Sequence, residues 1–279
     1  MPGGENEWRT LPKANSSYAT YDNSLYDRLA QDCAQVWDAD VNFASYGYVA
    51  FTLDQKVVGA AGVGGTFNIG KDGVAWQAGT LIGSSQLDPS LTAHEMGHAF
   101  NLPHSSTPDG GLYNTAYDLL SAPGGNCNSV QWGFGCDPGE LTTFHKWWLL
   151  GWIRDTRVAV PGTGGPKQIT LERISDPASS TNPLAARIWV NAQKSYIVEA
   201  RMGNGANTYD KQIPGDAVII STAETNAHSG MRWGAIEFVG SDGGNDGWWA
   251  DAGSMWVPGE TWTSPEGLSV KVDSKNASS

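Results

Sequence analysis

The segment HEMGHAFNLPH, residues 94–104, carries three histidines and one glutamate at spacings that suit metal chemistry. On a helix, His94 and His98 lie one turn apart, so both imidazoles can reach one ion, and Glu95 lies beside them. The third histidine, His104, falls outside this helical spacing and can join them only if the chain reverses direction. The segment therefore predicts a metal site with His94, His98 and His104 as ligands.

The residues between the second and third histidines permit such a reversal. A chain that leaves a helix and turns back usually needs a glycine, which adopts the left-handed conformation without strain. Asn101 stands at this position, and asparagine is the residue other than glycine that best tolerates a positive φ. Pro103 prevents the helix from continuing. His104 is therefore expected to return to the ion.

Three neutral imidazoles define the chemistry expected at this site. They leave one coordination position of Zn2+ open, whereas structural zinc sites usually fill all four positions and favour cysteine. Zinc lowers the pKa of a bound water to about 7, and Glu95 can accept its proton and pass it to a leaving amine. We therefore expect hydrolysis of a peptide bond, with Glu95 as general base and acid. The two other histidines, His145 and His228, are isolated in the sequence and receive no role.

Hydrophobic patterns predict the elements that position this segment. Apolar residues at helical spacing predict an amphipathic helix from about residue 24 to 38. Three short β-rich stretches separated by glycines predict a small twisted sheet. These stretches are residues 48–53, 57–63 and 74–81. Asp88 as a cap, followed by Pro89 at the first helical position, predicts the start of the helix that carries the histidines.

The later part of the chain changes from helical to β-rich patterns. Asp137, with Glu140 three residues later, predicts a capped helix that ends at Gly151. Beyond it, short alternating stretches are separated by turn residues. These stretches are residues 168–171, 187–190, 196–200, 217–221, 236–239 and 268–272. The expected fold class is α+β, with a catalytic region at 1–154 and a sandwich-like β-rich region at 155–279 packed on it.

Composition excludes several kinds of partner. The chain has 279 residues, with 17 lysines and arginines against 29 aspartates and glutamates, and its net charge of -12 disfavours nucleic acid. No apolar run approaches the roughly 18 residues that a membrane span needs. The expected partner is a protein or peptide substrate, and a monomer is favoured.

The cysteines and the N-terminus bear on localisation. Cys127 and Cys136 flank a short loop that a disulfide could close, which leaves Cys33 as a small buried residue. The opening stretch MPGGENEWRT has neither a basic nor an apolar signal region, so a secretion signal is either absent or already removed. A loop disulfide and a composition rich in Gly, Ser, Asn and Trp favour a secreted, extracellular protein.

Two features of the C-terminal half leave alternatives open. An oxygen-rich stretch could hold Ca2+, although an acidic surface turn is the favoured interpretation. Its residues are Asp242, Asn245, Asp246 and Asp251. Clustered tryptophans could line a groove for a glycan or peptide, or they could fill a small β core. They are Trp248, Trp249, Trp256 and Trp262.

The histidine motif resembles that of the metzincin metallopeptidases, HExxHxxGxxH, with Asn101 in the glycine position. The stretch YDLLS at 117–121 resembles the methionine-containing turn beneath the metal in those enzymes, with Leu120 in the methionine position. This resemblance implies a metzincin-like catalytic fold, a zinc cofactor and peptidase activity.

Other stretches are similar to those of immune inhibitor A-like and gametolysin-like secreted peptidases. They are residues 146–153, 195–201, 209–210, 213–220 and 256–262, and the resemblance extends over about residues 24–273. It implies a secreted zinc metalloendopeptidase.

Two other functions stay open from the residues alone. The departures at Asn101 and Leu120, with the clustered tryptophans, also suit a glycan- or protein-binding β module with a vestigial zinc site. A zinc hydrolase that acts on non-peptide amides is the other alternative. Tyr113, Tyr117 and His228 could each approach the developing oxyanion, and the residues alone do not choose among them.

Overall fold

A computed structural model of the chain contains several sheets and few helices, so the predicted α+β class is confirmed at that level. It describes residues 8–18, 24–54, 61–68, 74–83, 87–106, 115, 117–121, 138–162, 164–175, 177, 181–203, 209–210, 213, 215–224, 236–239 and 252–276. No helix among these residues is long and apolar enough to cross a membrane. The chain divides into two compact units, an N-terminal unit (Met1–Asn101) and a C-terminal unit (Leu102–Ser279).

The N-terminal unit is built on a three-stranded sheet. Its strands are β1 (Tyr48–Leu53), β2 (Ala61–Asn68) and β3 (Val74–Gly83), in the order β1-β3-β2. β3 runs parallel to β1 and antiparallel to β2. The predicted stretches 48–53 and 74–81 correspond to β1 and β3, whereas the predicted stretch 57–63 overlaps β2 only at 61–63, and residues 57–60 lie outside the described part of the chain. A side chain at Gly79 in the central strand would lie 2.4 Å from the carbonyl oxygen of Val49, so only glycine lets the two strands approach.

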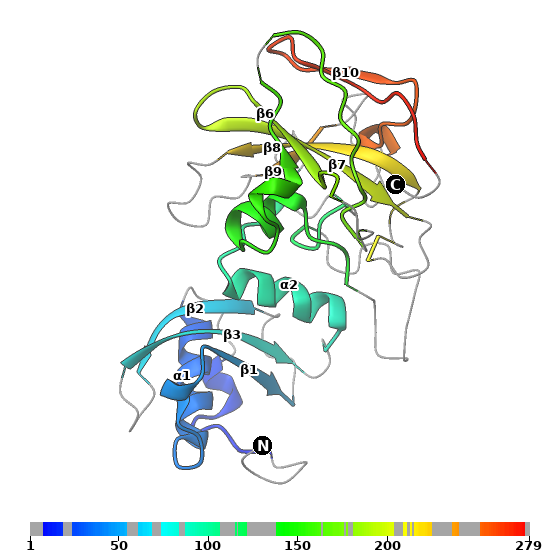
Figure 1. The fold of residues 1–279 in the computed structure, drawn as a ribbon. Helices are drawn as coiled ribbons and strands as arrows, with labels where there is room; N and C mark the ends of the chain where they lie inside the picture. The colour runs from blue at the N-terminus through cyan, green and yellow to red at the C-terminus, as the bar shows by residue number, and fades with distance from the viewer. Residues whose placement is uncertain are drawn as a thin grey trace. The chain divides into compact units, whose positions relative to one another are not determined.

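Two α-helices lie on opposite sides of this sheet (Figure 1). Helix α1 (Leu25–Trp37) confirms the predicted amphipathic helix, and its apolar side fills the core of the unit. The buried residues of this core are Tyr18, Leu25, Leu29, Ala30, Cys33, Ala34, Phe43 and Leu81. Cys33 is a free, buried thiol, as expected, and burial raises its pKa to about 12. Short 3-10 turns, η1 (Asn15–Tyr18) and η2 (Phe43–Ser45), flank the helix.

The second helix, α2 (Pro89–Ala99), carries the first two histidines of the motif. It begins as predicted, because the Asp88 carboxylate accepts hydrogen bonds from the backbone N–H groups of Ser90 and Leu91, and Pro89 takes the first helical position. The helix packs against β2 and β3.

The C-terminal unit contains a six-stranded sheet in the order β4-β9-β8-β7-β6-β5. Its strands are β4 (Ser105–Ser106), β5 (Val158–Ala159), β6 (Ala185–Trp189), β7 (Lys194–Met202), β8 (Asp216–Glu224) and β9 (Ile236–Phe238). A separate pair, β10 (Thr261–Thr263) and β11 (Ser269–Lys271), is antiparallel. The six-stranded sheet therefore includes one strand, β4, that precedes residue 154. The predicted boundary between a catalytic region at 1–154 and a β-rich region at 155–279 stays a prediction.

Successive side chains along β7 and β8 point to opposite faces of the six-stranded sheet, and both faces are buried. Ile197 and Ile219 pack on one face with Tyr117 and Phe144. The other face is covered by the segment of β10 and β11. Its core consists of Ala186, Tyr196, Val198, Ile220, Trp256, Trp262 and Val272. Trp256 and Trp262 thus fill a β core. For these two tryptophans, this is the second of the two predicted alternatives, a small β core and not a groove for a glycan or peptide.

Two local predictions about this unit need correction. Residues 168–171 form no strand; only Arg173, just beyond them, makes an isolated bridge, to Ala200. Their alternation reflects Ile169 and Leu171 packing on the core without a partner strand. The predicted helix starts later than Glu140, because residues 138–142 are not helical, and it consists mainly of the π-helical segment η5 (His145–Leu149). This segment ends two residues before Gly151, whose φ is 66°. Asp137 lies outside the described residues. The remaining 3-10 turns are η6 (Asp155–Arg157) and η7 (Ala252–Ser254).

Candidate metal centre

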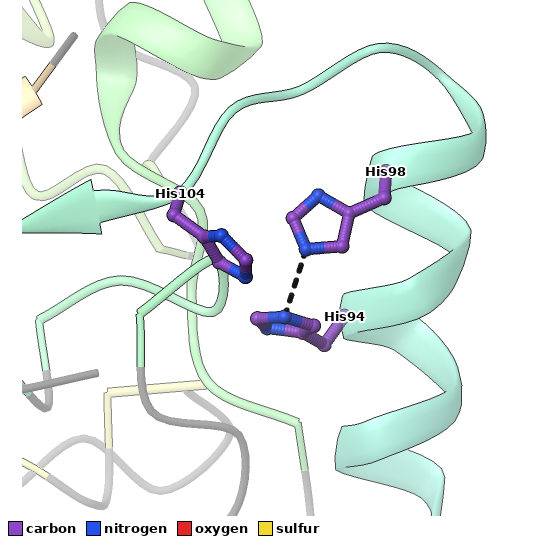
Figure 2. Close-up of side chains that lie close together, drawn as sticks. All are labelled: His94, His98 and His104. Atoms are coloured by element: carbon purple, nitrogen blue, oxygen red, sulfur yellow. Dashed lines mark hydrogen bonds between the residues drawn. The ribbon is translucent and has the colours of Figure 1, made fainter. Parts of the chain in front are cut away.

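Three imidazoles from one short stretch of chain converge in the structure (Figure 2). His94 and His98 project from α2, and His104 lies just before β4. One ring nitrogen of each histidine lies within 4.8 Å of the others. The predicted ligands are therefore brought together, and this group could bind a metal ion.

The geometry of the first two histidines fits a tetrahedral ion. The Nε2 atoms of His94 and His98 face each other at 3.0 Å, with the ring planes at 90°. Two nitrogens that each lie about 2.0–2.1 Å from a tetrahedral zinc ion are roughly 3.3 Å apart. The two rings are thus close to the separation that zinc requires.

The chain reversal that delivers His104 depends on Asn101. Its φ of 62° is the only positive value among the described residues other than glycine. The residue before it, Phe100, is the C-cap of α2, and its backbone N–H still donates to the carbonyl oxygens of Met96 and Gly97. Asparagine therefore does what the sequence predicted, taking the left-handed conformation that glycine would take without strain.

Burial separates these residues from ordinary surface side chains. His94, Glu95 and His104 are buried, and His98 is partly exposed. Glutamates are rarely buried without a polar partner or a metal, and Glu95 has at least one electrostatic or hydrogen-bonding partner. A solvated helix glutamate, the simplest alternative for Glu95, is excluded by its burial.

The YDLLS turn lies next to the third histidine. The backbone N–H of Ser105, which follows His104, donates to the carbonyl oxygen of Leu120 at 3.3 Å. Leu120 is completely buried, and the turn closes through a bond from the Ser121 N–H to the Asp118 carbonyl oxygen. The apolar side chain expected at this position is therefore present in a buried turn beside the strand that His104 enters.

Sequence reasoning missed a buried pair between this turn and η5. The Asp118 carboxylate lies 3.4 Å from Nδ1 of His145, and both side chains are fully buried. Burial alone would raise the pKa of Asp118, but the facing His145 ring lowers it below its ordinary value. His145 had no role in the sequence because its partner is 27 positions away and no local pattern connects them.

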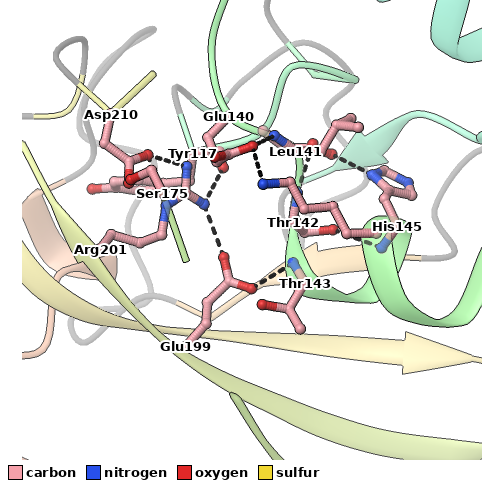
Figure 3. Close-up of polar contacts among 12 residues, drawn as sticks. Tyr117, Glu140, Leu141, Thr142, Thr143, His145, Ser175, Glu199, Arg201 and Asp210 are labelled. Atoms are coloured by element: carbon pink, nitrogen blue, oxygen red, sulfur yellow. Dashed lines mark hydrogen bonds and ion pairs between the residues drawn. The ribbon is translucent and has the colours of Figure 1, made fainter. Parts of the chain in front are cut away.

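A second buried network centres on Arg201 in β7 (Figure 3). Its guanidinium donates to Glu199 at 2.8 Å, to Asp210 and to the backbone carbonyl of Tyr117 at 2.7 Å. Glu199 in turn accepts a hydrogen bond from the Thr143 backbone N–H at 2.8 Å. The sequence held a signal for this network, since Glu199 and Arg201 are charged residues in a strand whose central residues, Tyr196 to Val198, are apolar and buried.

Several predicted features lie outside the described residues. They are Cys127, Cys136, Tyr113, His228, Trp248, Trp249 and the proposed calcium ligands Asp242, Asn245, Asp246 and Asp251. Of the candidates for oxyanion contact, Tyr117 is described; it is fully buried in the C-terminal core, against Phe238.

The chain was also compared with known proteins. No family model, no curated protein and no solved structure matches it. The resemblance to secreted metzincin-type peptidases therefore rests on the sequence stretches named above.

Proposed function

We propose that the chain is a zinc-dependent hydrolase that cleaves peptide bonds, of the metzincin type and secreted. The observation that carries this proposal is the convergence of three imidazoles, His94, His98 and His104, beside a buried Glu95 on the same helix. Catalytic zinc sites keep three protein ligands and one open position, and this donor set has that composition.

Each residue has a defined part in the proposed reaction. The three histidines hold the ion, which when bound acts as a Lewis acid toward water and the substrate carbonyl. Glu95 accepts a proton from the attacking water while the water oxygen forms a bond to the carbonyl carbon of the substrate. It then delivers that proton to the amide nitrogen as the C–N bond breaks. Hydrolysis thus consumes one water and leaves Glu95 as it began.

A glycan- or protein-binding function is supported by a different observation. Trp148, Trp152 and Trp189 are 44%, 64% and 42% exposed, which is unusual for such large apolar side chains. Trp148 and Trp189 both stack on the guanidinium of Arg187. The Cζ atom of Arg187 lies 4.7 Å from the ring centroid of Trp148 and 3.6 Å from that of Trp189. These rings could contact a glycan or a substrate chain, with or without catalysis in the same molecule.

The substitution Glu95→Gln tests the proposed mechanism. We expect the variant to keep bound zinc, because no ligand is lost, and to lose about 10²- to 10⁴-fold in the rate of peptide hydrolysis. Zinc content by elemental analysis and digestion of casein, blocked by a chelator and restored by zinc, measure the two effects. Glu224→Gln, at an exposed position at the end of β8, is the matched control and should change neither.

The outcomes separate the three functions. Undiminished proteolysis in the Glu95 variant would contradict the mechanism. Zinc binding without cleavage of casein or a peptide library would favour the binding module. Cleavage of small non-peptide amides with no cleavage of peptides would favour the other zinc hydrolase.

A further inference from the structure

We propose that the buried pair Asp118 and His145 is a positioning device for His104, so that zinc affinity depends on two residues outside the ligand set. The inference rests on the proposed function only in that the three histidines bind zinc. Asp118 and His145 supply no atom to the group of converging ring nitrogens.

The first step concerns the Asp118 carboxylate. One oxygen accepts a hydrogen bond from the Thr142 backbone N–H at 3.3 Å, and the other lies 3.4 Å from His145 Nδ1. The carboxylate thus joins the turn at 117–121 to the chain segment that leads into η5. Two residues further along this turn, the Leu120 carbonyl oxygen accepts a hydrogen bond from the Ser105 backbone N–H at 3.3 Å.

The second step concerns His145 and the segment that carries it. The π-helical turn closes through a bond from the Leu150 N–H to the His145 carbonyl oxygen, and the His145 N–H donates to the Thr142 hydroxyl at 3.3 Å. Among the described residues, Asp118 is the one carboxylate within 4 Å of the ring, and neither ring nitrogen has another polar partner. A buried imidazole of this kind costs free energy unless the facing carboxylate holds it.

The third step connects the turn to the metal ligand. The turn at 117–121 is completely enclosed, and the Ser105 N–H donates to the Leu120 carbonyl oxygen directly after His104. On its other side the Leu119 N–H donates to the Glu140 carbonyl oxygen at 2.9 Å. A shift of the turn would therefore move β4 and, with it, the backbone of His104.

A role in packing alone does not account for this pair. Apolar residues of similar volume would fill the same space with less desolvation cost than a carboxylate and an imidazole. Groups behind the ligands of a metal site fix ligand orientation, and their loss typically weakens metal binding 10- to 100-fold. Asp118 and His145 fit such an orienting role, because they fix the turn at 117–121, which contacts Ser105, the residue after the ligand His104.

Zinc titration of the full chain tests the proposal, with a chromophoric chelator as competitor. The variants are Asp118→Asn, His145→Phe and His145→Gln. We expect Asp118→Asn and His145→Phe to raise the Kd for zinc at least 10-fold, and His145→Gln, which keeps a donor, to raise it less than His145→Phe does. Tyr196→Phe is the control, because it removes a hydrogen bond to Glu266 on the other face of the sheet and should leave the Kd unchanged.

Folding is monitored separately by circular dichroism and unfolding of the metal-free chain. If Asp118→Asn does not fold, the two His145 variants decide. Unchanged zinc affinity in folded variants, or tighter binding by His145→Phe than by His145→Gln, would overturn the positioning role while the wild-type chain still binds zinc. A wild-type chain that binds no zinc would overturn the proposed function as well, so the two failures are distinguishable.

Discussion

The two units of the molecule bury different kinds of residue. The core of the N-terminal unit is apolar. Outside α2, the one buried acidic residue in the described part of this unit is Asp32, which is held by the Tyr18 hydroxyl at 2.7 Å and by the half-exposed Lys13. The C-terminal unit buries many charged side chains. They include Asp118, Glu140, Glu172, Arg187, Glu199, Arg201 and Asp210.

The difference follows from what covers each sheet. Regular helices cover the N-terminal sheet, and a helix satisfies most of its own backbone groups. One face of the C-terminal sheet is covered partly by irregular chain at 117–121 and 138–142, whose backbone groups need partners from elsewhere. Buried charged groups supply these partners: Asp118 accepts from the Thr142 N–H, and Arg201 donates to the Tyr117 carbonyl oxygen. Buried charge here replaces the hydrogen bonds that regular structure would provide.

The largest effect is expected from Arg201→Met, which removes the centre of the charged network. The change leaves Glu199 and Asp210 buried without their cation, and breaking a buried pair in this way costs about 3–5 kcal/mol. Denaturant unfolding followed by tryptophan fluorescence measures the loss. Arg154→Met, at an exposed position, is the control and should cost less than about 0.5 kcal/mol. A loss below 1 kcal/mol for Arg201→Met would mean that the network does not hold the irregular chain.

A smaller effect is expected from Gly79→Ala in the N-terminal unit, where packing rather than charge is decisive. The new Cβ would lie 2.4 Å from the Val49 carbonyl oxygen, a backbone atom that cannot rotate away. Forcing the strands apart costs about 1–3 kcal/mol. Gly47→Ala, with no atom within 4 Å of the added group, is the matched control. Equal unfolding free energies for the two variants would show that β1 and β3 do not pair this closely.

The same contrast explains what could be predicted from the sequence. Helix α1 follows from apolar spacing, and α2 follows from Asp88 and Pro89, because these signals act over a few residues. The convergence of the three histidines was predictable for the same reason, since they lie within one segment of eleven residues, 94–104. The motif encodes its own geometry through helical spacing and the positive φ of Asn101.

The parts that escaped prediction depend on contacts between distant residues. Arg201 and the Tyr117 carbonyl are 84 positions apart in the sequence. Asp118 and His145 are also distant in the sequence, so no local pattern predicts that they pair. The two-residue strand β4 is too short to leave a periodic signal. Residues 168–171 alternate between polar and apolar types but form no strand. Alternation requires only that every second side chain, here Ile169 and Leu171, packs on the core, and it does not require a hydrogen-bonded neighbouring strand.

The smallest effect is expected at Asn101, where the N-terminal unit ends along the chain. Because its φ is 62°, alanine at this position would carry the strain of the left-handed conformation, about 1–2 kcal/mol, whereas glycine would carry none. We therefore expect Asn101→Ala to lower the free energy of unfolding by about 1 kcal/mol and to weaken zinc binding, while Asn101→Gly keeps wild-type zinc affinity. Denaturant unfolding and zinc competition measure both. If alanine and glycine behave alike, the reversal before His104 does not depend on a left-handed residue, and the motif positions its third ligand by another route.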